Sequence, residues 1–233
     1  MLTKELIQQI EGSSLRDSLA VVASLFPGKV VFSSSLGQED QVITDAVCKN
    51  NIAVKIFTID TGRLFNETYE LLDKTIARYK KPIQVYFPEA GDVEEFVLNK
   101  GINSFYESVE NRKACCHIRK VKPLNRALAG AKVWITGLRA EQSANRMEMP
   151  VIEWDDTRQL YKFNPLIRWR YDDVMDYIKE FNVPYNSLHD KGFLSIGCAP
   201  CTRAIEPGED ARAGRWWWET SQKECGLHQT VTK

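Results

Sequence analysis

The sequence has no surplus of positive charge and no long apolar run. Its 31 lysine and arginine residues balance its 31 aspartate and glutamate residues, which argues against a broadly basic surface for nucleic acid. No segment approaches the roughly 20 apolar residues of a membrane-spanning helix. Residues 1–12 lack the apolar centre of a signal peptide. We therefore expect a cytoplasmic protein that binds neither nucleic acid nor membranes.

Two familiar phosphate-binding motifs are also missing. The chain contains neither a P-loop nor a G-x-G-x-x-G motif. It shows no internal repeat and no low-complexity segment. Its 43% hydrophobic and 27% charged residues are typical of a globular protein, and 233 residues are enough to bury a sizeable core.

The cysteines are unevenly distributed. Cys48 and Cys225 stand alone, Cys115 and Cys116 are adjacent, and Cys198 and Cys201 form a C-x-x-C motif. In a cytoplasmic chain six cysteines indicate metal binding or redox chemistry rather than a disulfide framework. The region around Cys225 has no apolar periodicity, so we expect an exposed thiol that is available for chemistry. An ordinary surface cysteine is the alternative.

Short apolar runs alternate with segments of helical periodicity along most of the chain. This alternation predicts an α/β fold with a doubly wound, mostly parallel sheet flanked by helices. A hairpin is expected at one sheet edge, over residues 151–163. We expect a single nucleotide-binding domain over residues 1–202 and a flexible C-terminal tail over residues 203–233. The expected strands cover residues 29–32, 53–58, 83–87 and 132–136, and the expected helices cover residues 3–11, 15–25, 41–49, 66–79, 92–99, 112–128 and 171–181.

Small and polar residues follow three of the expected strands. They form the segments Ser33–Asp40, Asp60–Arg63 and Thr136–Arg139. In an open α/β sheet, ligands bind at the carboxyl ends of strands. Small side chains there let backbone amides approach an anion. Each segment alone is more often an ordinary loop, but three together favour a nucleotide pocket.

The same three segments carry a family resemblance. Ser33-Ser34-Ser35-Leu36-Gly37-Gln38-Glu39-Asp40 resembles the modified pyrophosphate loop of sulfonucleotide reductases, in the adenine nucleotide α-hydrolase-like superfamily. Residues 59–65, 136–139 and 224–228 resemble the other motifs of that family. The resemblance covers nearly the whole chain. It implies these nucleotide-side residues: Ser33, Ser34, Ser35, Gly37, Asp40, Asp60, Thr61, Gly62, Gly137 and, less directly, Arg139 and Arg146.

The paired cysteines supply four thiolates, which suit either an iron–sulfur cluster or a structural zinc ion. Spacing alone does not separate these two. Unliganded buried thiols are a poor explanation for four cysteines in two groups. A thioredoxin-type C-x-x-C normally opens a helix after a strand. Cys198 instead lies in an expected loop, which disfavours that motif. The pattern resembles the branch of the family that carries one 4Fe-4S cluster per subunit. That resemblance implies the cluster ligands Cys115, Cys116, Cys198 and Cys201.

Several cations are candidates for an anion clamp. Lys120 follows Cys116 by one helical turn, so both side chains can face the same way. Isolated lysines and arginines are usually solvated surface charges, yet arginine is well suited to phosphate or sulfate. The resemblance supports a clamp of Lys120, Arg212, Arg215 and His228. We expect the Trp216–Trp218 run to pack the base of the tail onto the domain.

The resemblance implies a reductase of adenosine 5'-phosphosulfate (APS), with the 3'-phosphorylated substrate (PAPS), or both substrates, as the alternative. Cys225 would attack sulfur and release AMP. Thioredoxin or glutaredoxin, as a separate protein, would then release sulfite. A homo-oligomer is expected. Two other classes stay open: an ATP-using adenylating enzyme, which the missing S-G-G-x-D loop disfavours, and a non-catalytic cysteine–metal module.

Overall fold

The computed structural model of this chain describes residues 2–143 and 146–219. A six-stranded sheet with strand order β3-β2-β1-β4-β6-β5 organises the fold. Strand β1 pairs in parallel with β2 and β4, and β4 pairs in parallel with β6. The antiparallel β5–β6 hairpin forms the edge, as predicted. The strands are β1 (Val30–Ser33), β2 (Lys55–Ile59), β3 (Ile83–Tyr86), β4 (Val133–Ile135), β5 (Ile152–Asp155) and β6 (Leu160–Phe163).

Helices alternate with the first four strands, which confirms the predicted α/β class. Within the described residues no helix is both long and apolar enough to cross a membrane. The α-helices are α1 (Lys4–Gly12), α2 (Leu15–Leu25), α3 (Gln38–Lys49), α4 (Asn66–Tyr79), α5 (Ala90–Lys100), α6 (Val109–Cys116), α7 (Lys122–Ala127) and α8 (Tyr171–Glu180).

The chain divides into two compact units, each assembled from separate segments. The first unit, here the sheet unit, contains Met1–Thr58, Glu70–Gln84 and Gly130–Asn186. The second, here the cysteine unit, contains Ile59–Tyr69, Val85–Ala129 and the described residues from Ser187 onward. The predicted division into residues 1–202 and 203–233 stays a prediction.

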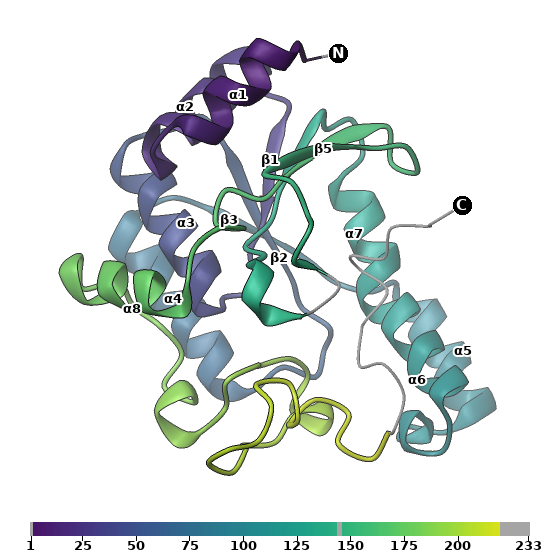
Figure 1. Cartoon of the computed structure of the whole chain (residues 1–233). Helices are drawn as coiled ribbons and strands as arrows, with labels where there is room; N and C mark the ends of the chain where they lie inside the picture. The colour runs from purple at the N-terminus through teal and green to yellow at the C-terminus, as the bar shows by residue number, and fades with distance from the viewer. Residues whose placement is uncertain (1, 144–145, 220–233) are drawn as a thin grey trace. The chain divides into compact units, whose positions relative to one another are not determined.

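The core of the sheet unit lies between the sheet and one layer of helices. Helices α1, α2, α3 and α8 lie on one side of the strands (Figure 1). They contribute Leu19, Val42 and Val174, which pack in the same cluster as Phe32 and Ile135 of the sheet. All five side chains are fully buried. Central parallel strands are covered on both faces, which explains why β4 and the first three residues of β1 are apolar.

The sheet topology brings the loops after β1 and β4 to neighbouring positions at one edge of the sheet. Strands β2 and β1 lie on one side of the point where the strand order reverses, and β4 lies on the other. The loop after β1 and the loop after β4 therefore begin at neighbouring carboxyl ends, and this switch point is where open α/β sheets bind ligands. Helix α3 begins at Gln38, directly after the first of these loops. The predicted start at residue 41 was therefore three residues late.

The helix predicted over residues 112–128 is interrupted. Helix α6 ends at Cys116, a π-helical turn covers His117–Val121, and α7 begins at Lys122. Pro123 lies in the first turn of α7, and proline has no N–H group with which to continue the regular hydrogen-bond ladder. The interruption lies directly before this proline. Such π turns occur often at functional sites.

Candidate functional site: a thiol pocket and a strand-end loop

The loop after β1 is held by a buried carboxylate. Asp40 of α3 accepts hydrogen bonds from the backbone N–H (2.5 Å) and the hydroxyl (2.6 Å) of Ser35. Burial raises the pKa of Asp40 to about 7, although the hydrogen bonds from Ser35 oppose the rise. The Nε1–H of Trp134 donates to the hydroxyl of Ser33 (2.7 Å), and the hydroxyl of Ser34 accepts from the N–H of Leu36 (3.2 Å). All three serines are thus fixed in place.

Two glycines of the sheet unit leave room around this loop. A Cβ added at Gly137 would overlap a carboxylate oxygen of Asp40, so no side chain fits there while Asp40 holds Ser35. Gly37 precedes the first turn of α3 and has no side chain to cover the helix N-terminus. Exposed amides at a helix N-terminus favour an anion. The structure therefore brings together Ser33, Ser34, Ser35, Gly37, Asp40 and Gly137, as the sequence predicted.

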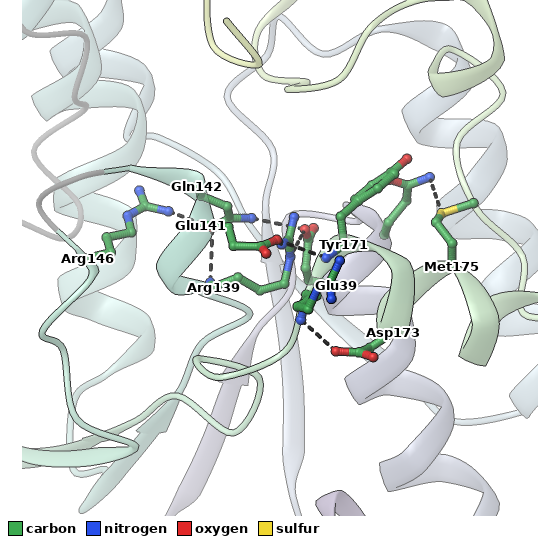
Figure 2. A network of polar contacts seen from close by, with 10 residues as sticks. Glu39, Arg139, Glu141, Gln142, Arg146, Tyr171, Asp173 and Met175 are labelled. Atoms are coloured by element: carbon green, nitrogen blue, oxygen red, sulfur yellow. Dashed lines mark hydrogen bonds and ion pairs between the residues drawn. The ribbon is translucent and has the colours of Figure 1, made fainter.

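Arg139 and Arg146 belong to a polar network on the same unit. Figure 2 shows Arg139 between two carboxylates, with its Nε donating to Glu39 (2.8 Å) and its Nη1 donating to Glu141 (2.9 Å). Gln142 donates to Glu39 (3.0 Å) and accepts from Arg146 (2.7 Å). Both arginines are buried and already engaged. Their expected part in nucleotide binding stays a prediction, whereas their part in holding Glu39 and Gln142 is a finding.

Four cysteines line one pocket in the cysteine unit. Cys115 and Cys116 come from the end of α6, and Cys198 and Cys201 come from the loop around the 3-10 turn Ala199–Cys201. Among residues 2–143 and 146–219, no three His, Cys, Asp or Glu side chains converge as ligands of one metal ion. The pocket is lined by Arg63, Phe105, Arg112, Cys115, Cys116, Arg119, Lys120, Cys198, Pro200 and Cys201.

The charges around the thiols differ from one cysteine to another. Burial would raise the pKa of Cys198, but Lys120, the Thr61 hydroxyl and nearby arginines hold it below its ordinary value. Burial raises the pKa of Cys201 to about 12, and the neighbouring thiols Cys198 and Cys116 add to the rise. Bringing several thiolates together therefore depends on the cations in the same wall.

The segment Asp60–Gly62 also lies in the cysteine unit. Asp60 accepts hydrogen bonds from the N–H of Gly62 (2.7 Å) and the hydroxyl of Tyr69 (2.9 Å). The hydroxyl of Thr61 lies 3.2 Å from the sulfur of Cys198. The carbonyl of Thr61 accepts from Arg119 (2.7 Å). The sequence predicted a nucleotide role for this segment and gave no sign of its contact with the cysteines.

Three of the four residues of the predicted anion clamp lie among the described residues. Lys120 lines the thiol pocket with Cys116, as the one-turn spacing predicted. Arg215 is buried and lies close enough to lower the pKa of Cys198. Arg212 is half-buried and does not line the pocket. His228 and Cys225 lie outside the described residues.

The tryptophan run packs as predicted. Trp216 is 1% exposed and shares a cluster with Phe105, Cys198 and Cys201. The ring of Trp218 packs edge-on against Tyr106, with centroids 4.5 Å apart. Trp217 is 41% exposed. Two of the three rings therefore hold the segment before residue 219 against the cysteine unit.

Sequence reasoning missed three arginines of the pocket, namely Arg63, Arg112 and Arg119. Arg119 follows Cys115 by four residues, the same spacing that pointed to Lys120, so that signal was present. Arg112 precedes Cys116 by four residues, so it had the same signal, whereas Arg63 had none. Arg63 reaches the pocket because its carbonyl accepts from the N–H of Ala199 (2.8 Å), a contact between distant parts of the sequence.

Comparison with known proteins agrees with this geometry. The chain is 52% identical to an adenosine 5'-phosphosulfate reductase of Sinorhizobium fredii over 226 residues, covering 97% of this chain and 90% of the relative. It is 49% identical to the protein of that name from Burkholderia cepacia, covering 99% and 91%. A crystal structure of phosphoadenylyl-sulfate reductase from Candida auris, a phosphate complex, matches with a TM-score of 0.73 at 29% identity, covering 88% of this chain and 98% of that one.

The family assignment rests on both the model match and these relatives. The family model described as the phosphoadenosine phosphosulfate reductase domain matches residues 29–204. That range begins one residue before β1 and ends three residues after Cys201, so it contains the strand-end loops and all four pocket cysteines. The chain belongs to the phosphoadenosine phosphosulfate reductase domain family.

Proposed function

We propose that this chain reduces APS to sulfite and AMP. The observation that carries the proposal is the pocket in which Cys115, Cys116, Cys198 and Cys201 meet Lys120. Relatives at about half identity over nearly the whole chain bear the name of this activity. A thiol-lined, cation-rich pocket suits a reaction in which an anionic sulfur group must be held while a bond to it breaks.

In the proposed reaction the thiolate of Cys225 attacks the sulfur atom of APS. The sulfur–oxygen bond breaks, its electron pair leaves with AMP, and an S-sulfonated cysteine remains. A dithiol protein such as thioredoxin or glutaredoxin then releases sulfite by thiol exchange and is itself oxidised to the disulfide. The dithiol supplies the two electrons that reduce the sulfur. The dithiol partner, the cytoplasmic location and the homo-oligomer are parts of this proposal.

The four pocket cysteines would hold a 4Fe-4S cluster. Their chemistry fits, because four thiols from two segments share one pocket with cations that favour their thiolate forms. When bound, the cluster would supply a local charge rather than transfer electrons in the reaction. Thr61 and Arg119 would hold the pocket wall through the contacts already described.

The remaining residues would divide the substrate between them. In the sheet unit, Ser33, Ser34, Ser35, Gly37 and Gly137 would offer small side chains and backbone amides to the nucleotide. In the cysteine unit, Lys120 and Arg215 would neutralise charge on the phosphosulfate. We assign Arg212 and His228 to the same clamp, and Asp60, Thr61, Gly62, Arg139 and Arg146 to the nucleotide side, on the family motifs.

One experiment tests the nucleophile. Wild type and Cys225→Ser, each loaded with iron, are incubated with APS carrying radioactive sulfur in the absence of reductant. We expect covalent label on the wild type and none on the variant. Persistent label on Cys225→Ser would show that another residue is the nucleophile. Cys48→Ser, which changes a half-buried cysteine packed against the sheet-unit core, is the matched control.

A second experiment tests the substrate. Sulfite release is measured from APS and from PAPS, side by side, with thioredoxin supplied. We expect the larger kcat/KM with APS; a larger value with PAPS would reverse the assignment. Release of pyrophosphate from ATP, with no sulfite from either nucleotide, would instead indicate an adenylating enzyme.

A further inference from the structure

A buried ion pair joins helix α6 to the last described residue of the chain. Nε of Arg112 donates to Oε1 of Glu219 (2.9 Å), and Nη2 donates to Oε2 (2.8 Å). The two side chains are 1% and 3% exposed. Burying two charges is costly, and a buried pair is often no more stabilising than apolar residues of the same volume. A contribution to stability is therefore a weak explanation for this pair.

Arg112 contacts more than the carboxylate. Its guanidinium carbon lies 4.6 Å from the ring centroid of Trp216, and that of Arg215 lies 4.7 Å from the same centroid. Arg112 also lines the thiol pocket, one helical turn before Cys116. One side chain thus touches the pocket, the buried tryptophan and the carboxylate at the end of the described chain.

Glu219 is fixed at a short distance in sequence from the proposed nucleophile. Its N–H also donates to the carbonyl of Trp216 (2.9 Å), so both its backbone and its side chain are held. Cys225 follows Glu219 by six positions in the sequence, and six residue-to-residue steps span at most about 20 Å. Whatever path those residues take, Cys225 stays within about this distance of Glu219.

We propose that the Arg112–Glu219 ion pair is a positioning device for Cys225. It fixes the point beside the thiol pocket from which the chain continues to the nucleophile. The inference rests on the proposed function, because it assigns a role in the attack of Cys225 on the substrate. Releasing the anchor moves the last fixed point of the described chain farther from Cys225 in the sequence, which lowers the effective concentration of the thiol at the substrate. A misplaced reacting group can cost up to about 100-fold in rate.

The test compares two identical substitutions on the iron-loaded protein. Glu219→Gln keeps the shape of the side chain and removes the negative partner of the buried ion pair. Glu209→Gln is the matched control, because Glu209 also accepts two bonds from one arginine, Arg203 (2.9 and 2.8 Å), but in an exposed pair. For each protein we would measure single-turnover labelling of Cys225 by APS, the dissociation constant for AMP, and the iron content.

We expect Glu219→Gln to slow labelling at least about ten-fold, with the AMP dissociation constant and the iron content unchanged, and Glu209→Gln to match the wild type. Labelling of Glu219→Gln at the wild-type rate would overturn the inference. So would a loss of rate that merely follows a loss of iron, which is what a structural role predicts. If the wild type itself takes no label on Cys225, the proposed function and the inference fall together.

A second variant guards against a folding failure of the first. Arg112→Lys keeps the positive charge but loses the planar fork that holds both carboxylate oxygens. We expect labelling slower than in the wild type, again with unchanged AMP affinity. Wild-type labelling by this variant would equally contradict the positioning role.

Discussion

In the sheet unit, carboxylates are surrounded by hydrogen-bond donors; in the cysteine unit, thiols are surrounded by cations. Asp40 accepts two bonds from Ser35, and Glu39 accepts bonds from Arg139 and Gln142. The thiol pocket instead has Arg63, Arg112, Arg119 and Lys120 in its wall. The first region fixes a loop by satisfying its own negative charges. The second region gathers positive charge around groups that become negative only when they lose a proton.

Each region also depends on one glycine next to a charged side chain. Gly137 makes room for the carboxylate of Asp40, and a Cβ added at Gly197 would overlap the guanidinium of Arg215. The comparison teaches that both regions are built around a buried ionisable side chain, the carboxyl group of Asp40 in one and the guanidinium of Arg215 in the other. On the proposed function, damage to the first region should affect nucleotide binding and damage to the second should affect reduction of the sulfur group.

The largest expected effect comes from removing a pocket thiol. In Cys198→Ser we expect loss of bound iron and of sulfite release, because one of the four proposed cluster ligands is gone. Iron content and the visible absorption of the purified protein measure this directly. In Cys48→Ser both should remain. Full iron content and full activity in Cys198→Ser would refute the assignment of Cys198 as a ligand.

The second largest effect is expected from adding a methyl group at Gly197. In Gly197→Ala the guanidinium of Arg215 must move, so we expect kcat/KM for APS to fall by about 100-fold, the order seen when one charge-stabilising donor is lost. Affinity for AMP, which lacks the sulfate, should fall much less. Equal losses for APS and AMP would show that Arg215 does not distinguish the sulfate.

The matching substitution in the sheet unit should not distinguish APS from AMP. Gly137→Ala displaces Asp40 and with it the loop at Ser35, so we expect AMP and APS to lose affinity together. Overpacking of this kind should lower the free energy of unfolding by about 1 to 3 kcal/mol. Isothermal titration with AMP and urea unfolding measure the two quantities. Unchanged AMP affinity would separate this loop from nucleotide binding.

The remaining prediction concerns pH. Burial raises the pKa of Asp40 from 3.8 to about 7, so the folded protein holds a proton that the unfolded chain releases at lower pH. The stability contribution is full below pH 3.8 and is lost as the pH rises to about 7, by on the order of 4 kcal/mol at most. Urea unfolding across this range should show the loss in the wild type and a smaller loss in Asp40→Asn. Identical pH dependence in both proteins would contradict it.

The sequence predicted the elements of the sheet unit well because their apolar periodicity is local information. The hairpin over residues 151–163 and the helices at residues 15–25 and 66–79 are confirmed. The early start of α3 was missed because its first turn, with Glu39 and Asp40, is polar, so the apolar pattern begins only later. The cysteine set was found from residue type and family motif.

The contacts that complete the site could not be predicted from local pattern. Thr61 and Cys198 are 137 positions apart, and Arg112 and Glu219 are 107 apart. Such pairs depend on how distant segments pack, which periodicity does not record. The tail motif around Cys225, the most specific signal in the sequence, lies outside the described residues, so its role stays a prediction.

The π turn at His117–Val121 sets the direction in which Cys115 and Cys116 lie around the helix axis relative to α7. A π turn holds about one residue more than an α-helical turn, and one residue corresponds to a rotation of about 100° around the helix axis. Helix α7 beyond the turn is anchored by the buried side chain of Leu124. A chain one residue shorter here could close into an unbroken helix, but Cys115 and Cys116 would then be turned by about that angle relative to α7. The extra residue therefore fixes the rotation about the helix axis between Leu124 in α7 and the sulfurs of Cys115 and Cys116 at the end of α6.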